Sequence, residues 1–509
     1  MVVASLLFGD CVNVRGVVVV TAAVLVLGTT FALGSAFGAH RVRDRDEWVD
    51  GRLLSTAIDS VRANALDSLP SEELIKRAVS GMLRELHDPY AALLKPEGYQ
   101  RYRGSLQGEG QGFGLTLRTQ AGVVSVVRVA VGSPAVLAGL RPGDRVLTVN
   151  AIPVAEGWGR RASDTSATPL DTVRLVVWRA PTGDTVRVAL RRGQWHVPAV
   201  ADAAMLEDSI GYVRLASITS KASAEVEHAV DALRQRGARA LVLDLRGNGG
   251  GLFDEGVNVA GLFLPRDAVV ASLASRGAVP PERHKGRVSR WPTMPLSILV
   301  DAGTASASEV IAVGLREHGR ALLVGAPTYG KGLVQRVVRL TPEFSLRLTT
   351  ARWLTPNGNA LQRRVGTGKD AHGGLLPDVT LADASRSDPF AVPREWTPAQ
   401  LLSASTIADS AAMLAIREGW STTPVAELEA RLRTRVVQPS APSKRRRDLA
   451  RAPWVPIATR LATARVLEIQ RETESLLRFA LRDDPALRAG LDLLEAPTVV
   501  SRLLPGARP

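Results

Sequence analysis

The sequence predicts a multidomain protein with an α/β core. A chain of 509 residues is long enough for three or four domains. Short β-branched runs between turn signals occupy 108–195, as is typical of a small β-rich module. Apolar strands then alternate with amphipathic helices from 210 to about 379, which indicates helices packed on a sheet. In chain order we expect an apolar N-terminal segment at 1–40, a helical region at 41–105, the β-rich module at 106–195, the α/β core at 196–385 and a helical C-terminal region at 386–509.

The N-terminal segment carries no charged residue over 16–39 and is long enough, as a helix, to cross a hydrocarbon core of about 30 Å. We expect it to be a membrane-spanning signal-anchor. A cleaved signal peptide, for which Gly34-Ser35-Ala36 offers small residues, and a buried core helix stay open as alternatives. Cys11 is the single cysteine, which excludes an internal disulfide framework.

The net charge of +14 comes mainly from arginine. The simplest interpretation is the codon usage of a GC-rich genome, and attraction to anionic lipid headgroups is the second. No zinc-finger spacing, RNA-binding aromatic motif or basic helix is present, so we expect no nucleic-acid partner. Neither H-E-x-x-H nor G-x-x-x-x-G-K-[ST] occurs, so we expect no metal and no cofactor. The basic run Lys444-Arg445-Arg446-Arg447 is interpreted as an exposed linker.

The expected elements follow from periodicity and turn signals. Residues 46–103 should be helical, with a second helix that begins at a Ser71 cap and ends at Asp88-Pro89. In the β-rich module we predict strands at 115–118, 123–129, 145–149, 173–178 and 185–190. In the core we predict strands at 210–215, 240–245, 296–301 and 321–325, and helices at 222–235, 253–263 and from Ser306 onward.

A serine and a lysine of the core lie in a pattern that favours nucleophilic catalysis. Ser306 opens an amphipathic helix, and Lys331, 25 residues later, lies in a glycine-flanked turn. A serine hydroxyl needs a base, and none of the seven histidines lies in a recognisable triad motif. A lysine can serve if burial lowers its pKa. Taken singly, Ser306 is interpreted as a helix cap and Lys331 as a solvated turn residue, and Ser308 is a competing nucleophile.

Several short blocks occur in a fixed order along residues 48–380. They are Gly81-Met82-Leu83, Asp88-Pro89-Tyr90, Gly112-Phe113-Gly114, Gly132-Ser133-Pro134-Ala135, Ala138-Gly139-Leu140, Pro142-Gly143-Asp144, Leu243-Asp244-Leu245-Arg246, Gly249-Gly250-Gly251, Ala305-Ser306-Ala307-Ser308-Glu309, Tyr329-Gly330-Lys331-Gly332 with Gln335, and Leu348-Thr349-Thr350-Ala351. One glycine-rich block alone is common, but the ordered set is specific. Together the blocks resemble the C-terminal processing peptidases, or tail-specific proteases, a family of serine endopeptidases.

The resemblance implies a crotonase/ClpP-like α/β protease core and a catalytic set at defined positions. Ser306 is implied as the nucleophile, Lys331 as the general base and Gln335 as the group that orients the lysine. The backbone N–H groups of Ala307, Gly250 and Gly251 are implied as an oxyanion hole. These roles agree with elementary chemistry, because a helix start favours negative charge and glycines let backbone donors approach a substrate closely. Asp244 is expected to brace the junction between strand and loop.

The β-rich module resembles a PDZ domain inserted before the core. Its signature is the loop Gly112-Phe113-Gly114-Leu115, whose backbone amides can capture a terminal carboxylate while a peptide adds as a strand. An ordinary hairpin start is the alternative. Between Val154 and Thr172 the usual apolar groove helix is poorly matched, and Trp158 there could line the groove or pack internally.

The leading hypothesis is a membrane-anchored or exported serine endopeptidase with a Ser–Lys dyad, which recognises the C-terminal tails of protein substrates through its PDZ domain. We expect it in a bacterial cell envelope, anchored in the inner membrane with its catalytic domains in the periplasm. A catalytically silent PDZ scaffold is the alternative from another class, and a crotonase-like enzyme of acyl-CoA chemistry is the third. Assembly as a homo-oligomer or with an adaptor stays open.

Overall fold

The computed structural model describes residues 52–362, 373–381 and parts of 404–498, with gaps at 68, 121–122, 142, 155–170, 180–182 and 208. The expected signal-anchor at 16–39, Trp158 with the groove segment, and the basic linker at 444–447 lie outside the described residues. Contacts divide the chain into two compact units, Met1–Leu93 and Leu94–Pro509. Among the described residues no helix is both long and apolar enough to cross a membrane.

The described part of the first unit is mainly helical. Residues 52–64 form one helix and α2 spans Ser71–Glu85. The expected Ser71 cap is wrong, because Pro70 occupies the cap position with an extended backbone and Ser71 is the first helical residue. The expectation of helix throughout 46–103 is wrong as well, because the short strand β1 forms at Ala92–Leu94 before α3 at Pro96–Gln107.

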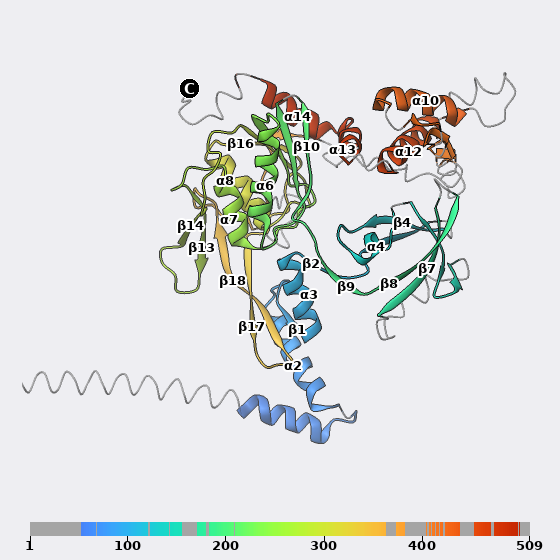
Figure 1. Cartoon of the computed structure of the whole chain (residues 1–509). Coiled ribbons are helices and arrows are strands. Elements are labelled where there is room, and N and C mark those ends of the chain that lie inside the picture. The colour runs from blue at the N-terminus through green and yellow to red at the C-terminus, as the bar shows by residue number, and fades with distance from the viewer. Residues whose placement is uncertain are drawn as a thin grey trace, which may run out of the picture. The chain divides into compact units, whose positions relative to one another are not determined.

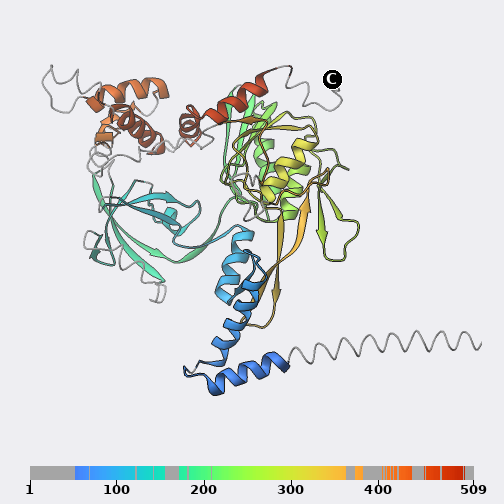
Figure 2. The same cartoon turned by 180° about the vertical axis from the view of Figure 1, so that it is seen from behind.

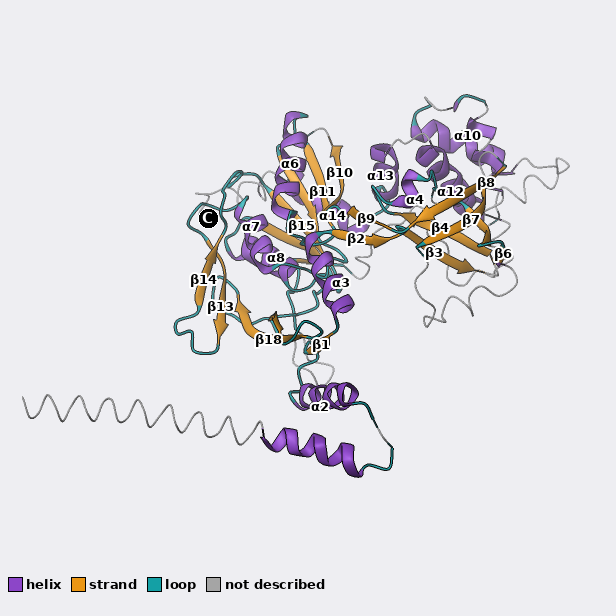
Figure 3. Cartoon of the chain, turned by 60° about the horizontal axis from the view of Figure 1, so that its bottom comes forward, coloured by secondary structure: helices purple, strands orange, loops and turns teal. Residues whose placement is uncertain are grey.

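The β-rich module is an antiparallel sheet of order β3-β4-β5-β7-β8, with β6 paired to β5, visible as orange strands in Figure 3. The strands are β3 Leu115–Gln120, β4 Val123–Val129, β5 Arg145–Val149, β6 Ile152–Pro153, β7 Thr172–Arg179 and β8 Asp184–Arg191. A short helix, α4 (Pro134–Leu137), closes a core of buried aliphatic side chains that include Val126, Leu140 and Val177. The strands β2 (Glu109–Gly112) and β9 (Gly193–His196) pair, so the chain enters and leaves the module along one ribbon.

The core is built on a sheet of order β10-β11-β12-β15-β16-β19. Its strands are β10 Val200–Glu207, β11 Ile210–Leu215, β12 Ala240–Asp244, β15 Leu296–Val300, β16 Ala321–Gly325 and β19 Val379–Thr380. β10 is antiparallel to β11, and the other neighbours are parallel. The predicted strands and helices of this region lie where the sequence places them, within one to two residues.

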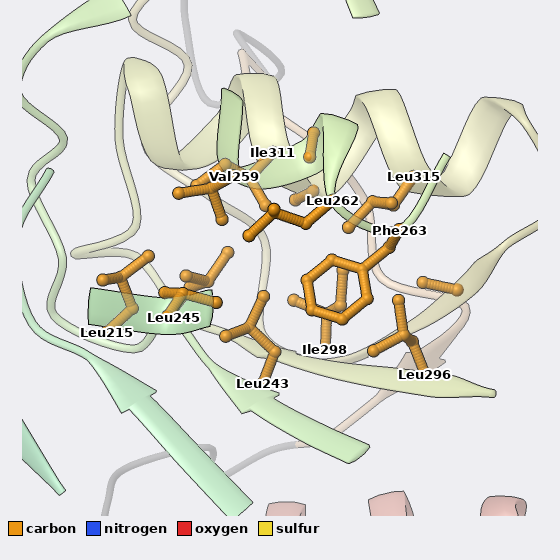
Figure 4. Packing of buried hydrophobic residues seen from close by; sticks show 14 of the residues in the cluster. Leu215, Leu243, Leu245, Val259, Leu262, Phe263, Leu296, Ile298, Ile311 and Leu315 are labelled. Carbon is orange, nitrogen blue, oxygen red and sulfur yellow. The ribbon is translucent and has the colours of Figure 1, made fainter. Parts of the chain in front are cut away.

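Helices cover both faces of this sheet, because each buried strand alternates its side chains between the two faces. On one face pack α6 (Ala222–Gln235), α7 (Phe253–Gly261) and α8 (Ala307–Glu317), as Figure 1 shows. Figure 4 shows Leu243 and Ile298 of the strands pointing toward this helical layer. Val242 and Leu299, one residue away along the strands, pack instead against α13 (Thr473–Leu481) and α14 (Pro485–Glu495). In Figure 2 the red α14 lies against the green strands.

A second, antiparallel sheet of the core was not predicted from the sequence. It contains β17 (Leu333–Arg339), β18 (Ser345–Leu354), β13 (Val269–Ser275) and β14 (Glu282–Lys285). The C-terminal region is helical where the structure describes it, as expected. Besides α13 and α14 it contains α10 (Val425–Val437) and α12 (Trp454–Ile469), which share an alanine- and leucine-rich cluster.

Candidate active site

Two loops meet at the carboxyl ends of the neighbouring parallel strands β12 and β15, the edge where such sheets place their sites. The first is the glycine loop, residues 247–251, and the second leads to Ser306. Asp301 joins them, because its Oδ1 accepts a hydrogen bond of 2.8 Å from the N–H of Gly247. The N–H of Ala305 donates to the carbonyl of Asn248 at 3.0 Å. The glycine loop and the serine turn are therefore held against each other by direct hydrogen bonds.

Ser306 has a strained backbone at the cap position of α8. Its φ is 57° and its ψ is −120°, a region that residues other than glycine rarely occupy and that costs of order 1–3 kcal/mol. The surrounding turn must hold this conformation, and strain of this kind gathers at functional sites. The residue is half-buried, whereas Ser308 is fully buried in the helix. The geometry therefore favours the hydroxyl of Ser306 over that of Ser308 as the one that a substrate can reach.

The buried side chain of Glu309 ties the serine turn to the lysine loop. Its Oε2 accepts from the backbone N–H of Ser306 at 2.8 Å and from that of Lys331 at 2.9 Å. Its Oε1 accepts from the hydroxyl of Thr328 at 2.6 Å and from the N–H of Gly330 at 2.8 Å. Glu309 is 0% exposed, and four donors supply the hydrogen bonds that a buried carboxylate requires. One carboxylate thus fixes the backbones of the predicted nucleophile and the predicted base side by side.

Further bonds hold the lysine loop from the other side. The indole Nε1 of Trp353 donates to the carbonyl of Lys331 at 2.9 Å, and the N–H of Tyr329 donates to the carbonyl of Thr304 at 3.0 Å. Lys331 itself is half-buried. Gln335 follows on β17, where its Nε2 donates to the hydroxyl of Thr349 at 3.3 Å. The loop that carries the lysine is therefore anchored at both ends.

The glycine loop brings its backbone against the start of α8. A Cβ on Gly250 would lie 2.6 Å from the carbonyl oxygen of Ala305 and 2.9 Å from the nitrogen of Ala307, so only glycine fits there. The N–H of Gly250 donates to Oδ1 of Asn248 at 2.9 Å. Ala307 is the first residue of α8, where the helix itself provides no acceptor for its N–H. Of the predicted oxyanion donors, Gly250 is thus already engaged with Asn248 in this structure, and Gly251 lies next to it.

A buried cluster of charged side chains, Asp244 and Arg246, lies at the end of β12, immediately before the glycine loop. Asp244 accepts from Nε and Nη2 of Arg246 at 3.0 and 2.8 Å and from the hydroxyl of Tyr212 at 2.7 Å. Burial opposes ionisation of Asp244, but the hydrogen bonds from Arg246 and Tyr212 hold its pKa below the ordinary value. Burial likewise opposes the charge of Arg246, but its carboxylate partners raise its pKa above the ordinary value. Asp244 thus braces the junction of strand and loop, as expected from the sequence.

The predicted carboxylate loop of the β-rich module lies far along the chain from these residues. Gly112 ends β2 with a φ of 124°, and Gly114 precedes β3 with a φ of 77°. The carbonyl of Phe113 accepts from Ala135 at 3.0 Å, and that of Gly114 accepts from Ala130 at 2.8 Å. Leu115, the first residue of β3, packs against the core of the module. Both of these bonds use carbonyl groups of the loop and not its N–H groups.

Sequence reasoning missed the linking role of Glu309 and of its partners. Glu309 did have a signal, because Ser306 and Glu309 form the S-x-x-E spacing of a capping box. Thr328 and Trp353 had none, because they reach the site from separate elements. Among the described residues, no group of three or more His, Cys, Asp or Glu side chains is placed to hold a metal.

Comparisons with known proteins match the same two parts of the chain. The pattern of peptidase family S41 matches residues 209–381, and that of the PDZ domain matches 112–194. The carboxyl-terminal-processing protease of Synechocystis is 32% identical over 321 residues, 62% of this chain and 72% of that protein. Its counterpart in Picosynechococcus is 35% identical over 310 residues, 60% of this chain and 72% of that protein. The solved photosystem II D1 C-terminal processing protease is 32% identical, and the match covers 65% of this chain and 89% of that one with a TM-score of 0.40.

Proposed function

The chain belongs to peptidase family S41 as a serine-type, carboxyl-terminal-processing peptidase with a PDZ domain, and we propose that it cleaves peptide bonds with a dyad of Ser306 and Lys331. The observation that carries this proposal is the shared carboxylate of Glu309, which binds the backbone N–H of both residues. A serine in a strained turn, with a lysine loop fixed beside it, supports this role, because a serine nucleophile needs a base nearby and backbone strain gathers at functional sites.

The proposed reaction begins with an unprotonated Lys331. Its Nζ takes the proton of the Ser306 hydroxyl while Oγ forms a bond to the scissile carbonyl carbon. The tetrahedral oxyanion is held by the N–H of Ala307 and by a donor of the glycine loop, at the positive end of α8. The lysine then gives the proton to the leaving amine as the C–N bond breaks, and water releases the acyl group by the same steps in reverse order.

The glycine loop constrains which donor completes the oxyanion hole. The N–H of Gly250 already donates to Asn248. If this N–H also donates to the oxyanion, the bond to Asn248 must be shared or broken. The N–H of Gly251 is the second predicted donor, in a residue that the structure leaves exposed. Gln335 lies on the strand that continues from the lysine loop, and we propose that it orients the amine without fixing it as a cation.

The test is cleavage of an unfolded protein substrate by purified variants. We expect Ser306→Ala to lose activity by about 10⁶-fold, as when the nucleophile of a serine protease is removed, with an unchanged melting temperature. Ser308→Ala is the matched control, because the hydroxyl of Ser308 is buried and has no hydrogen-bond partner in the part of the chain that the structure describes. It should stay within about threefold of the wild type. Cleavage retained by Ser306→Ala would refute the dyad, and a wild type without activity would favour the scaffold alternative.

Substrate selection and location form the second part of the proposal. We propose that the PDZ domain binds the C-terminal tails of protein substrates at Gly112, Phe113, Gly114 and Leu115. We also propose that the core has the crotonase/ClpP-like architecture, which the parallel strands with α6, α7 and α8 on one face support.

We further propose that 16–39 anchors the protein in the inner membrane of a cell envelope. Extraction of membranes with carbonate, which should leave the full-length chain in the pellet, tests the anchor.

A further inference from the structure

We propose that Asp484, in the C-terminal helical region, is a positioning residue for the glycine loop, and that α13 and α14 therefore belong to the catalytic machinery of the core. This inference rests on the proposed function of the glycine loop as the source of an oxyanion donor. Asp484 lies about a hundred residues beyond the segment that matches the peptidase family, which ends at 381.

The contact that carries the proposal is a buried guanidinium between two carboxylates. Arg246 donates from Nη1 to Oδ1 of Asp484 at 3.0 Å, and its Nη2 lies 2.9 Å from Oδ2. The other edge of the same guanidinium binds Asp244. The side chains of Arg246 and Asp484 are 1% and 0% exposed. A paired carboxylate on each side fixes both the position and the plane of the guanidinium, because Arg–carboxylate geometry is directional.

Asp484 is itself held rigidly. Its Oδ1 caps α14 by accepting from the N–H groups of Ala486 and Leu487 at 3.1 and 3.0 Å. Leu487 and Leu491 of the same helix are buried against the sheet. Gly490 lets the helix approach closely, because a Cβ there would lie 2.7 Å from the hydroxyl of Ser297 on β15. The cap residue is thus fixed relative to the strands, and not only to its own helix.

Arg246 is covalently continuous with the glycine loop, so the position of its backbone sets where the loop begins. Arg246 is the residue before Gly247, and its own N–H donates to Asp244 at 3.0 Å. The next residues are bonded to the serine turn, through Gly247 to Asp301 and through Asn248 to Ala305. We therefore expect a displacement of the guanidinium to strain these bonds and to shift the loop relative to Ser306. A misplacement of about 1 Å remote from the chemistry can cost about 10²-fold in rate.

The chain offers a matched control pair. Arg236, at the end of α6, binds Glu474 of α13 at 2.9 Å. This pair also joins the core to the C-terminal helices, but its side chains are 49% and 34% exposed. Among the described residues, no hydrogen bond or ion pair joins it to the glycine loop, and Glu474 also binds Arg478 of its own helix at 2.8 Å. Exposed ion pairs contribute little, so a neutral amide at Glu474 tests the loss of an inter-segment ion pair without disturbing the loop.

The experiment compares Asp484→Asn and Glu474→Gln in the full-length protein, with kcat and KM measured on an unfolded protein substrate. Asparagine caps helices as well as aspartate does, so the start of α14 should persist while the charge that faces Arg246 is lost. We expect Asp484→Asn to lower kcat by about 10- to 100-fold with KM within about twofold. The reaction of Ser306 with a fluorophosphonate probe should slow by a similar factor. Glu474→Gln should leave all three quantities within about twofold.

The outcomes separate this inference from the proposed function. Wild-type kcat in a folded Asp484→Asn would overturn the positioning role. If Asp484→Asn does not fold, Asp484→Ser, which keeps a capping hydroxyl, is measured in its place. Failure of both variants to fold would make Asp484 a residue of the fold alone and would also overturn the proposal. Refutation of the proposed nucleophile is read from Ser306→Ala, a different variant, and does not depend on Asp484.

Discussion

Among the described residues, a glycine-rich loop of the core and one of the PDZ domain differ in what holds them. In the core, the glycine loop is tied by side chains that come from other elements, namely Asp301 after β15 and Asp484 through Arg246. In the PDZ domain, the loop at 112–115 is tied by backbone bonds from Ala130, which follows β4, and from Ala135 of α4. Two loops with similar glycine content are thus fixed in different ways, which suits the different roles proposed for them. Catalysis needs donors that are fixed before the substrate arrives, whereas a peptide that adds as a strand supplies its own backbone partners.

The two loops are expected to affect different kinetic constants. Changes in the core should lower kcat for every substrate, because they act on the reacting groups. Changes in the PDZ domain should raise KM, and only for substrates with a free C-terminal carboxylate. The clusters of buried side chains that support the two loops share no residue, so we expect the two kinds of effect to be separable.

Among the changes that test this comparison, the largest effect is expected from Lys331→Arg. Arginine cannot lose its proton in a protein, so it cannot act as a base. The value of kcat should fall by about 10²- to 10⁴-fold, the usual contribution of general acid–base catalysis, and equally for free-acid and amidated substrates. Lys285→Arg, at an exposed lysine paired with Asp267, is the control and should be unaffected. A Lys331→Arg variant that keeps a tenth of wild-type kcat would show that another group is the base.

Gly250→Ala should have the next largest effect. The new Cβ would meet the carbonyl oxygen of Ala305 at 2.6 Å, at a glycine φ of 91°, so the serine turn must shift. We expect kcat to fall by about 10²- to 10³-fold, as on loss of an oxyanion donor, with little change in KM. Gly249→Ala is the matched variant, because a Cβ there meets nothing within 4 Å. It should keep at least ten times the kcat of Gly250→Ala, and equal losses in the two would argue against the close approach as the cause.

Gly114→Ala tests the loop of the PDZ domain and should change KM but not kcat. A Cβ on Gly114 would lie 2.0 Å from the Cβ of the buried Ser133, at a φ of 77°. We expect KM for a tailed substrate to rise about tenfold, a loss of about 1.4 kcal/mol in binding, while kcat stays unchanged. Gly183→Ala has a similar φ of 71° but open space around it, so it controls for backbone strain within the same domain. A fall in kcat for Gly114→Ala would contradict the separation of the two loops.

The smallest effect is expected from a change in the substrate. Amidation of its C-terminus removes the charge that the loop at 112–115 is proposed to hold but leaves a carbonyl oxygen that can accept hydrogen bonds. It should raise KM a few-fold, because a hydrogen bond to a charged group contributes about 1.5–3 kcal/mol and one to a neutral group about 0.5–1.5 kcal/mol. In Gly114→Ala, free-acid and amidated substrates should be cleaved alike. Equal KM values for both substrates with the wild-type enzyme would mean that the PDZ domain does not bind the carboxylate.

The sequence by itself determined the order of the PDZ domain and the peptidase core and most elements of the parallel sheet. β11, α6 and β16 have the predicted bounds, and β12 and β15 end one residue early. These elements are predictable because buried parallel strands are continuous apolar runs and amphipathic helices repeat every 3.6 residues. The motif order likewise pointed to Ser306 and Lys331, because each lies in a short motif and the two motifs are only 25 residues apart in the sequence.

Only the tertiary structure decided what fixes these residues in place. Glu309 binds the lysine loop across 22 residues, and Asp484 binds Arg246 across 238. Nothing near Asp484 in the sequence distinguishes it from an ordinary helix cap. The sheet of β13, β14, β17 and β18 was missed because its strands are half-exposed and carry no clear alternation. Periodicity records which face of an element is buried, whereas the partner of a buried charge is chosen by whichever distant segment the fold brings within hydrogen-bonding distance.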